Sequence, residues 1–154
     1  MVLKNSLIVL FTAAMPISEL RGAIPLGMAM DLPFYLIWIN SFLGNIIPII
    51  PIFLSLKYLL VFGRKNKTLD RFFDWWFLRV NKKSEIIRKY GFWGLVLFVA
   101  VPLPVTGAWT GTAAAFLMKF KLRQAFFGVL IGVFFASIIV SLASFGVFSW
   151  LKSI

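Results

Sequence analysis

The segment MPISELRGAIP, residues 15–25, breaks an apolar stretch of the chain with two prolines, a glutamate and an arginine. Proline disfavours a helical conformation at the residue before it, so Pro16 predicts the end of one helix, and Pro25 fits the first turn of the next. The apolar piece before the break, residues 5–14, would rise only roughly 15 Å as a helix, about half of a bilayer's ~30 Å hydrocarbon core. Neither piece of this stretch can cross a membrane alone.

A second break, VPLPVTGAWTGT at residues 101–112, carries Pro102 and Pro104 and separates two similarly short apolar pieces. Non-helical backbone at membrane depth is tolerated only where protein or a wet cavity surrounds it. We therefore interpret residues 5–30 and 92–118 as two re-entrant helical hairpins, each of which dips to mid-membrane and returns to the same side. The alternative is one kinked span in each stretch.

The composition excludes a soluble fold. Hydrophobic residues make up 61% of the 154 residues and charged residues only 14%, which is too few to cover a soluble surface of this size. The apolar residues come in long blocks, and residues 33–62 and 124–151 are each long enough for an ordinary transmembrane helix. The sequence therefore predicts a multi-pass membrane protein.

The two halves of the chain match each other. A shift of 88 residues aligns three pairs, namely Pro16 with Pro104, Ser18 with Thr106 and Gly44 with Gly132. A hairpin followed by one span makes an odd number of crossings, so the second half must be inverted. We expect an all-α integral membrane protein with two inverted repeats in a single domain, residues 1–154. Its parts are repeat one at 5–62, a linker at 63–91 and repeat two at 92–151.

The basic residues predict the orientation in the membrane. The net charge is +11, and nine of the sixteen Lys and Arg residues lie between Arg64 and Lys89. The hairpin arrangement places thirteen basic residues on one side, Lys4 and Lys152 on the other, and Arg21 within the membrane. The positive-inside rule then makes the linker cytoplasmic and puts both termini outside the cell membrane. The charge is expected to contact anionic headgroups rather than nucleic acid.

Two further segments carry helical patterns. Within the linker, apolar residues recur at helical spacing among charged ones, which predicts an amphipathic helix lying on the cytoplasmic leaflet. The apolar positions are Leu69, Phe72, Phe73, Trp76 and Val80. In the last span, Gly128, Gly132 and Ala136 form a series of small residues that lets another helix approach closely. That helix could belong to a hairpin of the same chain or to the second subunit of a homodimer.

Glu19 and Arg21 are the charged residues that this arrangement places deep in the membrane, where a charge is costly unless it is paired or hydrated. Arg21 offers a planar donor fork suited to phosphate, beside helix N-termini that favour anions. Glu19 is the candidate proton-exchanging group, because burial favours the protonated carboxyl while a nearby arginine favours the carboxylate. The structural alternative is that the two charges neutralise each other and fix the hairpin tip.

The second hairpin contributes uncharged candidates for substrate binding. Thr106, Thr110 and Thr112 offer hydroxyl groups, and Gly107 and Gly111 permit close approach of the backbone. The structural alternative is that the hydroxyl groups form hydrogen bonds with backbone groups that the helix break leaves unpaired.

Catalytic and metal chemistry have few residues to draw on. The chain has no cysteine and no histidine, and it has only five carboxylates. Thiolate nucleophiles and the usual zinc sites are therefore excluded. We expect a protein that is not an enzyme and needs no metal or cofactor.

The motifs ELRGAIP (19–25) and PLPVTGAWTGT (102–112) resemble those of the small multidrug export protein family over nearly the whole chain. That family looks like a compact relative of the DedA/VTT superfamily, whose fold has two inverted re-entrant hairpins, each followed by a span. The DedA second hairpin typically carries arginines, whereas residues 98–112 here contain none.

The resemblance implies translocation of lipids, since DedA proteins are associated with recycling polyprenyl-phosphate carriers, with coupling to the proton gradient. The expected function is a transporter of an anionic lipid, a polyprenyl-phosphate carrier or a phospholipid. One alternative is a proton-coupled exporter of small cationic drugs, against which Arg21 argues by repulsion. Another is a membrane scaffold that transports nothing. A cavity that reaches Arg21 would favour transport, and a dry, packed tip would favour the scaffold.

Overall fold

The computed structural model describes residues 1–62, 85–102 and 106–152, and these residues are helical with no β-strand. The predicted all-α class is therefore confirmed. The amphipathic helix predicted around Leu69 to Val80 lies outside the described residues. The helices are α1 (Val2–Ala14), α2 (Glu19–Ala29), α3 (Phe34–Ile46), α4 (Ile49–Phe62), α6 (Glu85–Ala100), α7 (Ala108–Leu117) and α8 (Leu122–Lys152).

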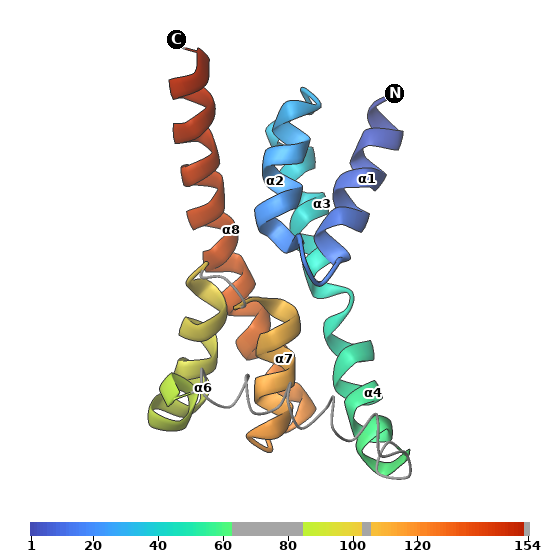
Figure 1. Cartoon of the computed structure of the whole chain (residues 1–154), viewed down its shortest axis with the longest axis vertical. Helices are drawn as coiled ribbons and strands as arrows, with labels where there is room; N and C mark the ends of the chain where they lie inside the picture. Colours follow the sequence, from blue (N-terminus) through green and yellow to red (C-terminus); the bar gives the residue numbers. More distant parts are fainter. Residues whose placement is uncertain (63–84, 103–105, 153–154) are drawn as a thin grey trace.

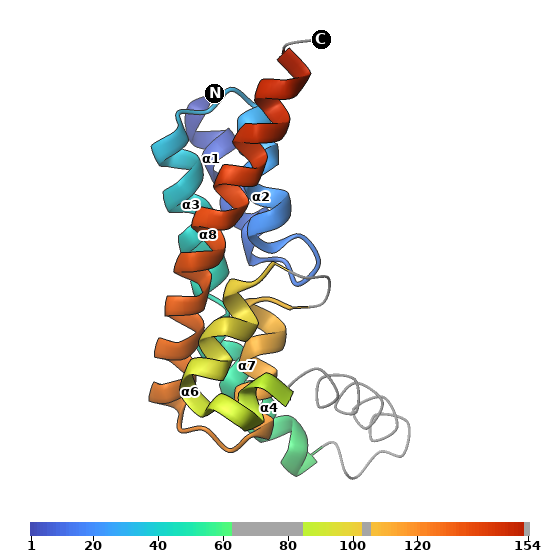
Figure 2. The ribbon, with the colours of Figure 1, turned by 90° about the vertical axis from the view of Figure 1, so that its left-hand side faces the viewer.

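Two helical hairpins occupy opposite halves of the molecule. Helices α1 and α2 pack together in the half that holds both chain termini, and α6 and α7 pack together in the other half (Figures 1 and 2). The turn between α1 and α2 and the start of α7 both lie near the middle of the long axis (Figure 2). The tips of the two hairpins therefore meet.

Two longer helical segments run along the length of the molecule (Figure 1). Phe34–Leu56 and Leu122–Trp150 are both long and apolar enough to cross a membrane. The first is divided between α3 and α4 at residues 47–48, because Pro48 lacks the N–H that would continue the helix. The α3 part packs against its own hairpin and α4 against α7, while α8 contacts α6, α7 and α2. Each segment thus joins both hairpins.

The two hairpins end in the same kind of turn. Asp31 and Lys119, which are 88 residues apart, have left-handed φ angles of 52° and 61°. The next amide closes the helix in both cases: Leu32 N donates to Gly27 O (3.2 Å), and Phe120 N donates to Ala115 O (3.0 Å). This is the 6→1 bond of a Schellman C-cap, which reverses the chain into the following helix.

One predicted break is wrong. Pro25 does not begin a new helix, because α2 starts six residues earlier, at Glu19, and contains Pro25 in its interior. A proline there leaves the carbonyl of Arg21 without its helical N–H donor. Pro16 and Pro102 do lie where α1 and α6 have ended, and Pro104 lies outside the described residues. At Gly91 a φ of 56° breaks α6 where the linker was predicted to end.

The small residues of α8 pack within the chain. A side chain at Gly128 would collide with Leu95, and one at Gly132 would collide with Val99. Both neighbours belong to α6, so this stripe of α8 is covered by the second hairpin. Gly44 makes the matching contact in the first half, against the backbone of α1 at Leu10. Gly128 and Gly132 therefore pack against a hairpin of the same chain, and the homodimer through Gly128, Gly132 and Ala136 stays a prediction.

Candidate functional site

The Glu19 carboxylate links the two hairpin tips. Glu19 is the first residue of α2, has a φ of 46° and is only 8% exposed. Its Oε1 accepts a hydrogen bond from the backbone N–H of Trp109 (3.3 Å), and the N–H of Ala108 also donates to this carboxylate. Ala108 and Trp109 are the first two residues of α7, so Glu19 caps the N-terminus of a helix in the other hairpin. The left-handed backbone of Glu19 costs about 1–2 kcal/mol, which these bonds offset.

Gly107 makes room for this carboxylate. A Cβ atom placed on Gly107 would collide with both carboxylate oxygens of Glu19. Gly107 has a φ of 164°, an extended conformation that any residue can adopt. The glycine is therefore needed for space and not for backbone freedom.

Arg21 extends the same contact. Its Nη2 donates to the carbonyl oxygen of Thr106 and lies 3.2 Å from the Thr106 hydroxyl. The Thr106 hydroxyl donates in turn to the carbonyl of Val101 (2.8 Å) at the end of the preceding helix. Arg21 is thus held by the loop of the second hairpin while its charge lies close to the Glu19 carboxylate.

Trp109 forms a third link between the tips. Its indole N–H donates to the carbonyl of Ala14, the last residue of α1 (3.1 Å). That carbonyl belongs to the unsatisfied C-terminal turn of a helix, which would otherwise need water. Trp109 therefore binds the first hairpin through both its backbone and its ring.

Two cavities border Arg21. One, of about 310 Å³, is lined by residues of both tips and is partly polar. Its lining is Pro16, Ile17, Glu19, Arg21, Thr106 and Thr110. The other, of about 340 Å³, runs between α2 and the second half of α8 and is largely apolar. It is lined by Arg21, Pro25, Pro102, Ile139, Val140, Ala143, Ser144, Val147 and Phe148. Open space therefore borders Arg21 in both directions.

A third, very small cavity lies behind the Glu19 contact. It measures about 10 Å³, close to the smallest space that holds one water molecule. Glu19, Arg21 and Gly107 line it together with Asn45. The Asn45 side chain is 1% exposed, and its Oδ1 has no hydrogen-bond partner among the described residues. The centre thus holds a buried amide with unused hydrogen-bonding capacity.

The structure brings together some of the predicted site residues and not others. Glu19, Arg21, Thr106, Gly107 and Thr110 meet at the hairpin tips. Thr112 is fully buried and donates to its own helix, at the carbonyl of Ala108 (2.6 Å). Gly111 packs against Val99 of α6. Both residues face the protein interior, away from the two larger cavities.

Sequence analysis missed the cap that Glu19 forms on α7, although a signal for it was present. Glu19 and Gly107 are 88 residues apart, so they occupy equivalent positions in the two halves. A glutamate in one half and a glycine at the matching position of the other suit a contact in which the glutamate side chain fills the space beside the glycine.

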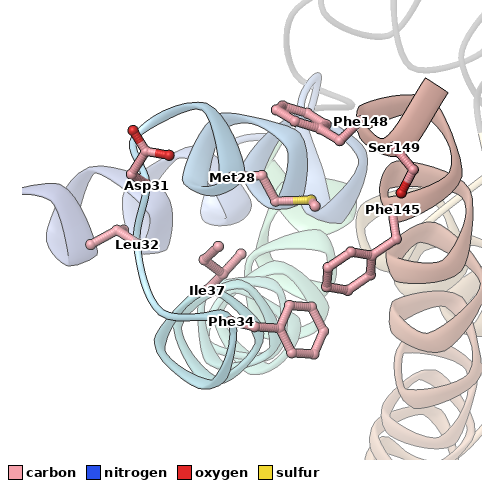
Figure 3. Close-up of a pocket in the computed structure, with 8 residues that line it drawn as sticks. All are labelled: Met28, Asp31, Leu32, Phe34, Ile37, Phe145, Phe148 and Ser149. Atoms are coloured by element: carbon pink, nitrogen blue, oxygen red, sulfur yellow. The ribbon is translucent and has the colours of Figure 1, made fainter. Parts of the chain in front are cut away.

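A separate cavity of about 290 Å³ lies at the end of the molecule that holds the chain termini. Met28 and Leu32 flank it on one side, the rings of Phe34 and Phe145 lie between α3 and α8, and the ring of Phe148 lies apart from them, between α2 and α8 (Figure 3). Phe34 and Phe145 are in ring contact, with centroids 4.9 Å apart. Asp31 lies at its rim with the carboxylate turned outward (Figure 3).

Comparison with known families gives one result. The model of a family described as "Putative small multi-drug export protein" matches residues 19–139. The matched range begins at Glu19 and includes both hairpin tips. No curated protein and no solved structure gives a significant match.

The contact between Glu19 and Gly107 predicts a suppressible defect. Gly107→Ala should lower the stability of the protein by about 1–3 kcal/mol, because the new methyl group displaces the carboxylate from its amide donors. Adding Glu19→Ala should relieve the collision, so the double variant should be no less stable than Glu19→Ala alone. The measurement is the thermal unfolding midpoint in detergent. Gly146→Ala is the control, because nothing lies within 4 Å of that position. Additive losses in the double variant would refute the contact.

Proposed function

We propose a lipid-transport function for this chain, which belongs to the small multi-drug export protein family. The family description and the two long apolar helices identify a membrane export protein. The finer proposal is that the protein translocates an anionic lipid, a polyprenyl phosphate or a phospholipid, across the cytoplasmic membrane without acting as an enzyme. The observation that carries it is the position of Arg21 on the border of both large cavities.

The two cavities suit the two parts of such a molecule. The cavity at the tips has hydroxyl groups of Thr106 and Thr110 and a charged pair, which suit a solvated phosphate headgroup. The cavity along α8 is lined by aliphatic side chains and Phe148, which suit a hydrocarbon chain. Among the described residues, Arg21 is the one that lines both cavities, where the charged and apolar parts of a lipid would join.

The scaffold alternative requires a tip in which the charges only hold the hairpins together. Arg21 and Glu19 do hold the hairpins together, through Thr106 and α7. The tip is nevertheless bordered by open space of about 310 Å³ and about 340 Å³. A purely structural clasp has no use for two cavities beside a buried charge, so transport is favoured.

Proton coupling is proposed through Glu19. The carboxylate accepts two backbone hydrogen bonds at the start of α7. A proton on this group would remove its charge and weaken both bonds. Proton uptake would therefore loosen the link between the hairpins, and proton release would restore it.

Two inverted repeats would supply alternating access. The matching turns at Asp31 and Lys119 support this arrangement, as does the meeting of the equivalent positions Glu19 and Gly107. If the hairpins are re-entrant from opposite sides, movement of one tip against the other exposes the centre to each side in turn. This is the arrangement that the resemblance to the DedA superfamily implies.

The proposed orientation in the cell membrane places both termini outside the cell and the linker 63–91 in the cytoplasm. The chain has no cysteine, so single cysteines can report it. Cysteine in place of the exposed Asp31 should react with an impermeant maleimide in intact cells. Cysteine in place of the exposed Lys121 should react only after the cells are opened. Labelling of Lys121 from outside, with none at Asp31, would eliminate the re-entrant hairpins.

Export of cationic drugs is a second candidate, favoured by the cavity of Figure 3. Three phenyl rings with a carboxylate at the rim can bind an organic cation through cation–π and charge interactions. On this hypothesis the purified protein binds tetraphenylphosphonium more tightly than tetraphenylborate, an anion of the same shape. Asp31→Asn should remove that preference, whereas Glu85→Gln, at the other end of the molecule, should retain it. Equal binding of both ions by the unmodified protein rules this candidate out.

Arg21 variants test the lipid proposal. Arg21→Lys keeps the charge but loses the planar fork, so the flipping rate of an anionic lipid in reconstituted vesicles should fall about tenfold or more. Arg21→Ala should abolish flipping. Arg123→Lys is the control, because Arg123 lies at the first turn of α8 beside Phe127, away from the tips.

The double variant Glu19→Gln with Arg21→Ala distinguishes a role of these two charges in transport from a purely structural role in holding the hairpins together. Removing both charges together avoids an unpaired buried carboxylate, so thermal stability should recover towards that of the unmodified protein. Flipping of anionic lipid should stay lost, because the phosphate has no guanidinium to bind. Normal flipping in a stable double variant would defeat the proposed function.

A further inference from the structure

The side chain of Asn45 is a buried amide with an unused acceptor. Asn45 lies in the last turn of α3, just before the break at residues 47–48, and is 1% exposed. Its Oδ1 has no hydrogen-bond partner among the described residues. Buried amides normally use their hydrogen-bonding groups, because a buried group left unpaired is costly. An amide oxygen can be satisfied only by a hydrogen-bond donor or by a cation.

Asn45 lines the same small cavity as Glu19. That cavity measures about 10 Å³, so the side chains on its wall lie within a small movement of one another. Arg21 is the one other charged or titratable group among its described lining residues, because α3, α6, α7 and α8 contribute only uncharged ones. In the adjoining polar cavity, Arg21 is again the charged neighbour of Glu19 among the described residues.

The charged form of Glu19 has nothing to donate to Asn45. A carboxylate only accepts hydrogen bonds, and this one accepts them from the N–H groups of Ala108 and Trp109. A protonated carboxyl carries one O–H donor, which is the group that Oδ1 needs. A metal ion is the other species that two such oxygens would bind, but Arg21 on the same wall disfavours a cation.

We propose that Asn45 Oδ1 accepts a hydrogen bond from the protonated Glu19 carboxyl and so positions Glu19 in its proton-loaded form. The use of this step in transport rests on the proposed function. The proton comes from hydronium in the polar cavity of about 310 Å³ that Glu19 also lines. One O–H bond breaks in hydronium, which becomes water, and one O–H bond forms on the carboxyl.

The proposed bond gives proton uptake a direction within the fold. The bonds of charged Glu19 go to α7, in the second hairpin, whereas Asn45 belongs to α3, which packs against α1 and α2 of the first. Protonation weakens the bonds to α7 and adds one to α3. Glu19 therefore changes from a link between the two hairpins to a link within the first half.

Replacement of Asn45 by leucine tests the bond through thermal unfolding of the purified full chain in detergent. With Glu19 charged, at alkaline pH, Asn45→Leu removes an unpartnered polar group, so the midpoint should stay or rise. In Glu19→Gln the glutamine N–H imitates the carboxyl O–H. There the same replacement should lower the midpoint by roughly 2–4 °C, the effect of one hydrogen bond in a chain of this size.

Ser41→Ala is the matched control. Ser41 lies one helical turn before Asn45, is fully buried, and has an Oγ without a partner among the described residues. Its replacement should change the midpoint equally with Glu19 and with Glu19→Gln. Should Asn45→Leu fail to fold, Asn45→Ala removes the same acceptor.

Infrared spectroscopy reports on the proton itself. The chain has only five Asp and Glu residues, so the band of protonated Glu19 can be identified as the one that Glu19→Gln removes from the difference between acidic and alkaline spectra. Donation of the O–H to Asn45 weakens the carboxyl C=O bond. The band should therefore move to higher wavenumber in Asn45→Leu and stay in place in Ser41→Ala.

The outcomes separate this inference from the proposed function. Equal effects of Asn45→Leu with Glu19 and with Glu19→Gln, together with an unmoved band, overturn the bond even if the unmodified protein flips lipid normally. Stabilisation by sodium chloride over choline chloride that Asn45→Leu abolishes assigns the two oxygens to a metal ion and also overturns it. The predicted shifts together with flipping that does not depend on pH retain the bond and remove proton coupling from the proposed function.

Discussion

A carboxylate buried between two hairpins is the constraint on which the centre of this molecule depends. Glu19 cannot stay charged inside an apolar protein without donors, and its own hairpin does not supply all of them. The first amides of α7 do. The tip of one hairpin must therefore reach the tip of the other, and Gly107 must lack a side chain where they touch. The bonds of Arg21 to Thr106 and of Trp109 to Ala14 fix the same meeting point.

The sequence was sufficient to predict where the helices break, because prolines interrupt two apolar stretches, while the re-entrant course of the hairpins through a membrane stays a prediction. Pro16 and Pro102 follow the ends of α1 and α6 as expected. The prediction at Pro25 was wrong because a proline ring suits the first turn of a helix. In the structure α2 begins earlier, at Glu19, where the chain is held by the bond of the Glu19 carboxylate to the N-terminus of α7. A proline inside α2 costs one hydrogen bond, at the carbonyl of Arg21, and the cavity that borders both residues lies beside that position.

The finer selection of site residues needed the helix phase, which the sequence does not give. Thr110 and Thr112 are the same residue type and look equivalent in the sequence. On a helix, however, residues two positions apart point in directions about 200° apart around the axis. One hydroxyl consequently lines the polar cavity, and the other is buried within the hairpin. The 88-residue shift did contain the main contact, since it sets Glu19 opposite Gly107. Only the fold shows that these equivalent positions touch.

The charges at the centre also decide which cargo suits it. With the Glu19 carboxylate in place, Arg21 and the N-terminus of α7 are balanced by one negative group. Without it the same centre is positive, so an anion is attracted there and a cation is repelled. On the proposed lipid transport, an anionic headgroup is attracted to Arg21. A cationic cargo would have to bind elsewhere, for example beside Asp31, whose cavity has no arginine among its described lining residues.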